Sequence, residues 1–585
     1  MSPRLRAYLW RHRRAYATGF ALSIAAALLV MVSPILVRLA VDGIARGMPV
    51  ARLGRYALGL AAVHAAVVVL RYFWRMSIFG ASRRIEYEMR NDYFAHLQGL
   101  HLGFFHHTRT GDLMARAVND LNTVQRFLGP GLMHGFSTLV TFAIAVGFML
   151  SVDLRLTLVM LVILPLVSLT FIILAPRIHV QFEAVQDQFS AISARAQENF
   201  SGIRVVKAFA QEAHEIEAFA SLNREYIRRN LGVIKSSGAL WPLIDLFLGL
   251  AAMMLLWQGG GAVISGRISI GQFVQFTAYL GLLAWPMVAL GWVVNLMQRG
   301  LASMKRLDEI FARRPAIADQ PEAVSLPAMR GEIEFRNVTF AYDGAPVLRD
   351  ISLRIPAGWT VAIVGPTGSG KSTLVNLIPR LFDVSAGQVL IDGLDVRGIR
   401  LTDLRRQIGV VPQDTFLFSD TLRENIGYGL ERVDDERVRQ AAEVAALARD
   451  VADFPQGYET VVGERGVTLS GGQKQRAAIA RAIARDPRIL ILDDALSAVD
   501  TSTEEEILSR LRTVLASRTA LIISHRVSTV RHADLIVVLD EGRIAEQGTH
   551  EELLARGGLY AALYQKQLLE QELEEAAADP GPSER

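Results

Sequence analysis

The residues with the clearest chemical role form a glycine-rich loop after an apolar strand. The strand is predicted over Thr360–Val364, and the loop reads Gly365-Pro-Thr-Gly-Ser-Gly370-Lys371-Ser372, with a helix following. Such a loop turns its backbone N–H groups and the helix dipole towards phosphate groups. Lys371 is expected to reach the β- and γ-phosphates, and the Ser372 hydroxyl to bind Mg²⁺. The loop therefore predicts a binding site for ATP or GTP. Its residues are Gly365, Pro366, Thr367, Gly368, Ser369, Gly370, Lys371, Ser372 and Thr373.

Two acidic residues follow a second apolar strand. The strand Ile489–Leu492 leads directly into Asp493 and Asp494. A metal-binding aspartate next to a carboxylate that polarises water would suit hydrolysis of a bound nucleotide. Two acids after a strand are weak evidence alone. Together with the phosphate-binding loop, they predict Asp493 as a Mg²⁺ ligand and Asp494 as a catalytic residue.

These groups need a soluble α/β domain to position them, and only the second part of the chain has that character. Of 585 residues, 51% are hydrophobic, and the apolar excess lies before about residue 300. From about Gly331, short apolar strands alternate with charged helices. A membrane part and an aqueous part are therefore expected, because so long a chain exceeds a single core.

Charge and cysteine content exclude several classes of function. The net charge of +4 is too small for a chain of this length to indicate a nucleic-acid partner. The sequence contains no cysteine, which excludes disulfides and thiolate metal sites.

Six stretches are long and apolar enough to cross a bilayer, which needs ~20 residues per helix. They are predicted near residues 15–39, 55–79, 132–151, 154–175, 240–264 and 272–297. The two long connections between spans are rich in arginine, whereas the other connections are short. Since basic residues mark the cytoplasmic side, both termini and both long connections are expected inside. This arrangement predicts a multi-pass protein of the inner (plasma) membrane, preceded by a basic interfacial segment at 1–14.

The two long connections are predicted to be helical extensions of the spans, because their apolar residues recur at helical spacing. Each contains a compact segment, Thr110–Arg116 in the first and Ser201–Lys207 in the second. These segments are expected to contact a soluble domain.

A few polar residues fall inside the predicted spans. Asp245 is the most conspicuous acid, and either a functional role or simple hydration near the end of the span would explain it. His64, Arg71 and Arg75 could line an aqueous cavity or extend towards the lipid headgroups. The transported compound is not readable from these residues.

A third motif lies between the loop and the acids. The pentapeptide Leu469-Ser470-Gly471-Gly472-Gln473 precedes a helix over Ala477–Ala484. It resembles the signature sequence of ATP-binding-cassette (ABC) proteins. Other landmarks of that family match in order, and the resemblance spans the whole chain. They are Tyr342 (adenine-stacking aromatic), Gln413 (Q-loop, catalytic and metal-binding), Ser497, Ala498 and Asp500 (D-loop) and His525 (catalytic switch histidine), together with the loop Val462–Gly466. Read alone, Tyr342 could be an ordinary strand aromatic and His525 a polar turn residue.

The resemblance implies an exporter half-transporter. Its fold class is a multidomain membrane protein: an all-α domain of six transmembrane helices with long cytosolic extensions, followed by an α/β P-loop ATP-binding cassette. The domains are expected at 1–14 (interfacial segment), 15–310 (membrane domain), 311–330 (linker), 331–569 (cassette) and 570–585 (acidic tail). In this family two cassettes enclose two ATP molecules with Mg²⁺. The signature sequence of each serves the nucleotide of the other, so a second half-transporter is required.

One residue departs from the family pattern. The family has glutamate at the position of Asp494, and aspartate is one methylene shorter. A misplacement of ~1 Å can slow a reaction ~10²-fold, so this site is expected to bind ATP and hydrolyse it slowly. A bridging water or a backbone shift could restore the reach. A damaged acid with an intact signature resembles one subunit of the heterodimeric multidrug and peptide exporters, and a heterodimer is favoured over a homodimer.

The predicted function is ATP-driven export of hydrophobic or amphipathic substrates, such as drugs, peptides or lipids, from the cytoplasm. A lipid flippase is the main alternative. An ATP-gated channel or a regulatory subunit is a further one, which nothing in the sequence favours.

Overall fold

The computed structural model describes residues 2–463, 469–499, 501–524 and 526–578. The chain divides into two compact units. The membrane unit comprises residues 1–99 and 108–314, and the cassette unit comprises residues 100–107 and 315–585.

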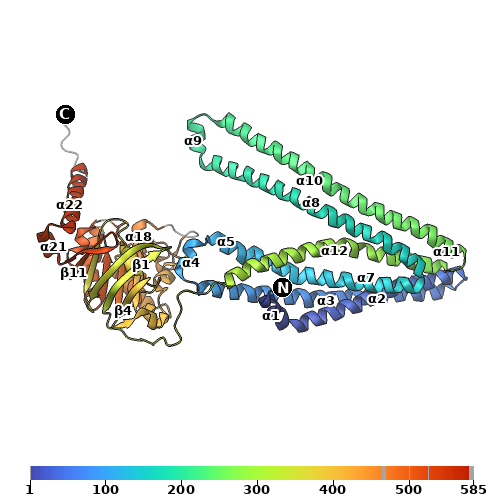
Figure 1. Ribbon diagram of the computed structural model, residues 1–585, viewed down its shortest axis with the longest axis horizontal. Helices are drawn as coiled ribbons and strands as arrows, with labels where there is room; N and C mark the ends of the chain where they lie inside the picture. The colour runs from blue at the N-terminus through green and yellow to red at the C-terminus, as the bar shows by residue number, and fades with distance from the viewer. Residues whose placement is uncertain (1, 464–468, 500, 525, 579–585) are drawn as a thin grey trace. The chain divides into compact units, whose positions relative to one another are not determined.

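Long helices make up the membrane unit (Figure 1). Its elements are α1 (Pro3–Arg11), α2 (Arg13–Ala45), α3 (Val50–Gln98), α5 (Thr110–Ala115), η1 (Arg116–Asp120), α6 (Leu121–Arg126), η2 (Phe127–Gly131), α7 (Leu132–Val152), α8 (Leu154–Ser201), α9 (Ile203–Ala208), α10 (Glu212–Met254), η3 (Leu255–Gly259), α11 (Gly260–Ile264) and α12 (Ile270–Phe311). Among the described residues, six helical stretches of 33 to 53 residues are apolar enough to cross a membrane. Each is longer than a bilayer requires, as expected for spans with helical extensions.

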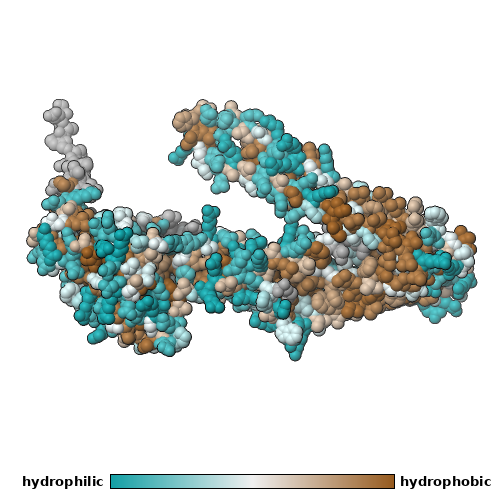
Figure 2. Space-filling view, viewed as in Figure 1, coloured by the Kyte–Doolittle hydropathy of each residue, from teal (hydrophilic) through white to brown (hydrophobic). Residues whose placement is uncertain are grey.

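Hydropathy marks where the membrane unit meets lipid. Figure 2 shows hydrophobic side chains gathered in a band across its long helices, with hydrophilic side chains towards α11 and along the α8–α10 pair. A second hydrophobic patch lies at the α9 end of that pair. The α9 end is held together by Glu215, which accepts hydrogen bonds from Arg195 and Asn199, both at 2.8 Å.

The basic N-terminal segment forms α1, which packs on other helices of the membrane unit. Leu5 is fully buried, and Arg11 and His12 both contact Glu88 of α3, at 2.7 and 2.9 Å. The guanidinium of Arg4 lies 3.9 Å from the ring centre of Phe311 at the end of α12. Besides any contact with lipid headgroups, this segment is therefore bound to protein.

Two carboxylates join the helix ends near the short connections. Asp42 of α2 accepts hydrogen bonds from Ser269 Oγ and Gly271 N, both at 2.8 Å, at the start of α12. Asp153, between α7 and α8, forms an ion pair with Arg267 at 3.0 Å. Asp153 also caps α8 by accepting from Leu156 N at 2.9 Å. These contacts fix α2, α7, α8 and α12 to one another at this point.

The cassette unit is built on two main sheets. Its strands are β1 (Ile333–Tyr342), β2 (Ala345–Ile355), β3 (Thr360–Val364), β4 (Ala386–Ile391), β5 (Leu394–Asp395), β6 (Ile408–Val411), β7 (Asp420–Thr421), β8 (Val461–Val462), β9 (Ile489–Asp493), β10 (Thr519–Ile523), β11 (Leu535–Asp540) and β12 (Arg543–Gly548). A six-stranded sheet has the order β12-β11-β3-β10-β9-β6, and a four-stranded antiparallel sheet has the order β2-β1-β4-β5. Strands β3, β10 and β9 are parallel neighbours, so their carboxyl ends meet at one edge, where α/β sheets bind ligands.

The helices of the cassette unit pack on these sheets. They are α4 (Leu102–His107), α13 (Lys371–Asn376), α14 (Leu401–Arg406), α15 (Leu422–Gly427), α16 (Asp435–Val444), α17 (Ala448–Asp453), α18 (Gly471–Ala484), α19 (Thr501–Leu515), α20 (Val527–Val530), α21 (His550–Arg556) and α22 (Leu559–Ala578). The sheet strands around β3 form one buried core. Helices α16, α18 and α19 share a second core with strands β6 and β9.

A short segment from the first long connection, residues 100–107, belongs to the cassette unit. His107 of α4 lies 3.3 Å from Asp343, and the His106 ring lies 5.9 Å from that of Phe382. Phe382 in turn contacts the ring of Tyr342 at 5.3 Å. The segment that packs on the cassette is therefore residues 100–107, slightly earlier in the chain than the predicted Thr110–Arg116, which lies in the membrane unit.

Candidate nucleotide-binding site

The phosphate-binding loop joins β3 to α13, and its glycines adopt backbone conformations that are unfavourable for other residues. Gly365 has φ 147°, and a Cβ there would lie 2.1 Å from the Leu539 carbonyl oxygen. Gly370, before α13, has φ 99°. Only glycine enters such conformations without steric penalty. The backbone can therefore curl closely enough to present its N–H groups to a phosphate.

Lys371 lies within this loop. Its ammonium donates to the carbonyl oxygens of Gly365 and Pro366, at 2.9 and 2.8 Å, and only 7% of the residue is exposed. Burial lowers the pKa of the Lys371 ammonium, and the carboxylates of Asp493 and Asp494 partly oppose that effect. The lysine is thus held where phosphate oxygens would arrive, at the mouth of the loop.

Ser372 and Asp493 form a pair of hard oxygen ligands. The Ser372 hydroxyl donates to Asp493 Oδ1 at 3.0 Å, and Asp493 is buried at the end of β9. Mg²⁺ favours such oxygens and is usually bound by one or two protein groups together with substrate phosphates. The residues present therefore fit the ion, which would neutralise phosphate charge when bound.

Asp494 follows in a left-handed backbone conformation, with φ 49°. Its N–H donates to the Ile523 carbonyl at 3.0 Å, which anchors it to β10. Its carbonyl accepts from the Ser497 hydroxyl at 3.0 Å. The backbone of Asp494 is thus fixed on both sides, which leaves its short side chain to determine the reach of the carboxylate.

These residues share one cavity of about 280 Å³. Its lining brings together Thr367, Gly368, Gly370, Lys371, Ser372, Thr373, Gln413, Asp493 and Asp494. Gln413 is exposed just after β6. Tyr342 lies at the end of β1, with its ring 4.7 Å from that of Phe340.

Of the predicted site residues, His525 and Asp500 lie outside the described residues, as do residues 464–466 of the Val462–Gly466 loop.

The signature residues begin α18. Ser470 caps the helix by accepting from Gln473 N at 3.2 Å, and the Gln473 side chain accepts from Ser470 N at 3.0 Å. Leu469 is buried, whereas Ser470 and Gly471 are exposed. The start of a 14-residue helix is thus open to solvent and suited to binding an anion.

Gln475, which the sequence reading missed, links the signature helix to the D-loop. It is 5% exposed, donates to Ser497 Oγ at 2.9 Å and accepts from Ala498 N at 2.9 Å. A Cβ on Gly472 would lie 2.9 Å from the Ala498 carbonyl oxygen, so this contact is tight. Ser497 also contacts Asp494, and Gln475 therefore connects the signature helix to the acid of the chain's own site.

Glu504 was not among the residues predicted from the sequence either. It is 1% exposed on α19 and accepts hydrogen bonds from Arg526 and from Thr529. Arg526 also donates to the Val499 carbonyl at 3.2 Å. Glu504 thereby ties the segment after β10 to the D-loop. Its only sequence signal was a polar residue on the apolar face of a helix.

The polar residues predicted within the spans lie in different environments in the structure. Arg71 and Arg75 line a cavity of the membrane unit. His64 instead contacts the Leu60 carbonyl of its own helix at 3.0 Å, and Asp245 is exposed on α10.

Known proteins share this architecture along the whole chain. Residues 16–287 match the ABC transporter transmembrane region, and residues 348–497 match the ABC transporter domain. A probable multidrug resistance ABC transporter ATP-binding/permease protein of Bacillus subtilis is 37% identical, covering 95% of each chain. An ATP-dependent lipid A-core flippase of Syntrophus aciditrophicus is 39% identical, covering 86% of this chain and 84% of the flippase. A solved bacterial Atm1-family ABC exporter with ATP bound matches with a TM-score of 0.78 and 33% identity, covering 96% of this chain and 99% of that one. The predicted fold class is confirmed, as is the use of ATP with Mg²⁺.

Proposed function

Because the chain belongs to the ABC transporter family, as an exporter half-transporter that acts as a dimer, we propose that it forms one subunit of a heterodimer with two unequal ATP sites. ATP hydrolysis coupled to transport follows from the family. The observation that carries the finer proposal is a short acid, Asp494, in the same chain as a complete signature motif, Leu469–Gln473.

Asp494 slows ATP hydrolysis at the chain's own site. Hydrolysis needs a carboxylate within hydrogen-bonding reach of the attacking water. The backbone of Asp494 is anchored to Ile523 and Ser497, so it cannot advance freely to replace the missing methylene. The phosphate contacts of Lys371 and Ser372 do not depend on that methylene. The site is thus expected to bind ATP well and to turn it over slowly.

The signature motif makes the partner's site competent. The exposed N-terminus of α18 can bind the phosphates of a nucleotide held by another cassette, with the Ser470 hydroxyl free to donate. A partner that carries glutamate at the corresponding position would then complete a hydrolytic site. This arrangement assigns turnover to one of the two sites.

Uncovered apolar surfaces support pairing. On α9 and beside it, Val205 and Phe209 are 61% and 72% exposed, at the end of the α8–α10 pair where Figure 2 shows a hydrophobic patch. On the cassette, Phe416, Phe418 and Tyr428 form an exposed aromatic cluster, with ring centres 4.7 and 5.2 Å apart. Exposed patches of this kind mark interaction sites. We propose that the partner subunit covers both.

Closing and opening of the two cassettes would drive export. ATP contacts both cassettes only when they are closed, so its binding favours the closed state. Closure moves residues 100–107 and α9, and their helices carry the motion into the membrane domain. With both termini and the cassette on the cytoplasmic side of the plasma membrane, hydrophobic or amphipathic substrates such as drugs, peptides or lipids would leave the cytoplasm.

The test is ATP turnover by the purified chain without its partner, where a second copy of the chain would supply the signature motif. The unmodified chain should hydrolyse ATP slowly, and Asp494→Glu should raise turnover about 10- to 100-fold by restoring reach to the water. Asp453→Glu, which lengthens an exposed aspartate elsewhere on the cassette, is the matched control and should change nothing. Brisk hydrolysis by the unmodified chain would contradict the unequal-site proposal.

A lipid flippase is the second candidate, favoured by the 39% identity to the lipid A-core flippase. It would use the same ATP sites on a substrate that enters from the bilayer. ATP-dependent movement of a fluorescent lipid between leaflets of reconstituted vesicles would support this candidate, and its absence alongside drug or peptide transport would exclude it.

A further inference from the structure

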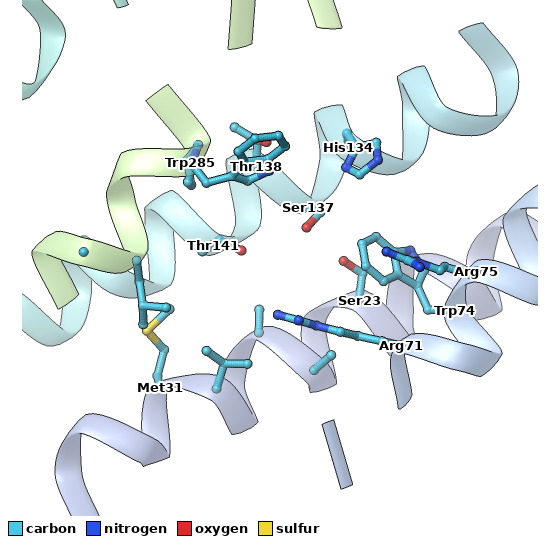
Figure 3. A pocket seen from close by; sticks show the side chains of 16 residues that line it. Ser23, Met31, Arg71, Trp74, Arg75, His134, Ser137, Thr138, Thr141 and Trp285 are labelled. Atoms are coloured by element: carbon cyan, nitrogen blue, oxygen red, sulfur yellow. The ribbon is translucent and has the colours of Figure 1, made fainter. Parts of the chain in front are cut away.

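A cavity of about 360 Å³ lies between α2, α3, α7 and α12 in the membrane unit. Figure 3 shows Arg71 extending from α3 into the space between α2 and α7, with Arg75 beside Trp74 near His134. The volume lies within the range of small-molecule sites, ~300–1,000 Å³.

The charge in this cavity has one sign. Arg71 and Arg75 are four residues apart on α3, so both guanidiniums occupy one face of the helix, where like charges repel. None of the described residues that line the cavity is acidic. Within the described part of the chain, neither arginine forms an ion pair, and both remain exposed to an incoming ligand. Uncompensated charge in a membrane span is unfavourable, and a bound anion would relieve it.

The neighbouring polar groups are also suited to an anion. The indole N–H of Trp74 has no hydrogen-bond acceptor among the described residues, although Trp74 is only 7% exposed. Buried indole groups normally find an acceptor. Ser23 and Thr138 supply buried hydroxyls from the facing helices α2 and α7. An acceptor-rich ligand would therefore satisfy a donor that the protein leaves open.

Apart from the hydroxyls of Ser137 and Thr141 and the imidazole of His134, the rest of the cavity wall is apolar. Met31 of α2 and Leu282, Trp285 and Pro286 of α12 line it, and Figure 3 shows Met31 and Trp285 on the side away from Arg75. A ligand that fits both sides has an anionic head and a hydrophobic tail.

We propose that this cavity binds an anionic amphiphile, with a phosphate or carboxylate head held by Arg71, Arg75 and Trp74. This inference rests on the proposed export function and names the substrate class of that transporter. In the proposed orientation, Arg75 lies near the cytosolic end of its span, where both an inner-leaflet lipid head and a cytosolic amphiphile can reach it.

The experiment measures equilibrium binding of radiolabelled dodecyl phosphate to the full-length chain, co-purified with its partner, in phosphatidylcholine nanodiscs. Binding to empty nanodiscs is subtracted. Saturable binding is expected, and excess unlabelled dodecyl phosphate should displace the label. Displacement by neutral dodecyl maltoside at equal concentration would overturn the proposal, because the head would then not matter.

Three variants test the residues. Arg71→Gln/Arg75→Gln should weaken binding by about tenfold or more, through the loss of charge-assisted contacts. Arg71→Lys/Arg75→Lys keeps the charge and should retain most of the binding. Arg52→Gln/Arg55→Gln removes two charges from the same helix outside the cavity and should bind as the unmodified chain does. Equal affinity of the two glutamine pairs would overturn the proposal, and thermal unfolding checks that each variant folds.

Two further measurements distinguish a lipid head from a free amphiphile as the ligand, and show whether a negative result contradicts this inference or the proposed function. If added phosphatidylglycerol competes with dodecyl phosphate, the site takes a lipid head. If it does not, the site takes a free amphiphile, and either result supports an anion site. ATP binding is measured on the same unmodified complex. Intact ATP binding without anion binding removes only this inference, whereas absent ATP binding removes the proposed function.

Discussion

The cassette presents two candidate phosphate-binding surfaces that are built in opposite ways. At the phosphate-binding loop, Lys371 and Asp493 are buried and already bonded to Gly365, Pro366 and Ser372. At the start of α18, Ser470 and Gly471 are exposed, and Ser470 is bonded to Gln473 of the same helix, whose side-chain amide also donates to Asp450 at 2.8 Å. The first surface is assembled within one chain, whereas the second would, in the proposed dimer, bind the phosphates of the partner's nucleotide.

This difference separates nucleotide affinity from turnover. Changes at the loop should alter ATP binding to this chain. Changes at the start of α18 should alter hydrolysis on the partner while leaving the loop intact. The following variants test that separation, from the largest expected effect to the smallest.

Lys371→Ala should weaken ATP binding at the chain's own site by about 10²–10³-fold, because a buried charge-assisted contact to phosphate is lost. Binding of a labelled ATP analogue to the purified chain measures this. Lys305→Ala, which removes an exposed lysine from α12, is the charge-matched control. Unchanged affinity in Lys371→Ala would contradict the assigned loop.

Ser470→Asp should reduce ATP hydrolysis by the heterodimer about 10²-fold, since a carboxylate would repel the partner's phosphates. Aspartate is a good N-cap, so α18 should keep its stability. Thr549→Asp makes the same change at the N-cap of α21 and serves as control. Equal losses in the two variants would show that the effect is not specific to the signature surface.

Asp494→Glu in the heterodimer should change which nucleotide is retained after turnover. The unmodified chain should carry mainly ATP, whereas the variant should carry mainly ADP, with hydrolysis at this site about tenfold faster or more. Chromatography of nucleotides crosslinked to this chain distinguishes the two. Predominant ADP on the unmodified chain would show that aspartate suffices.

Gln475→Leu should have the smallest effect. It leaves Ala498 N without its acceptor and should destabilise the cassette by ~1–3 kcal/mol, with a several-fold loss of hydrolysis. Thermal unfolding measures the first effect. Gln440→Leu, at an exposed glutamine on α16, should stay within ~0.5 kcal/mol. A stable, fully active Gln475→Leu variant would mean that the D-loop is held by other contacts.

The sequence predicted which residues of the candidate cassette site lie together, because they belong to short local patterns. Gly365–Ser372 and the Asp493–Asp494 pair can be read from spacing, and the sheet edge brings them together as expected. Gln475 and Glu504 could not be read, because their partners lie 22 to 25 residues away and become neighbours only when α18 and α19 pack.

For the membrane domain, the sequence predicted the spans but not which of their polar residues line a cavity. Hydropathy located the six spans, since length and composition decide them. It could not separate Arg71 and Arg75 from His64, because the face of α3 that meets a cavity depends on which helices surround it. The cassette contact of residues 100–107 was likewise hidden, since it depends on packing against Phe382.

The contacts of Asp42 and Asp153 have a mechanical consequence. By fixing α2, α7, α8 and α12 at one point, they supply a fulcrum from which α8 extends for 48 residues. At 1.5 Å per residue this is a lever arm of ~70 Å. A swing of only ~5° about that fulcrum would carry its far tip through ~6 Å, as far as one helical turn.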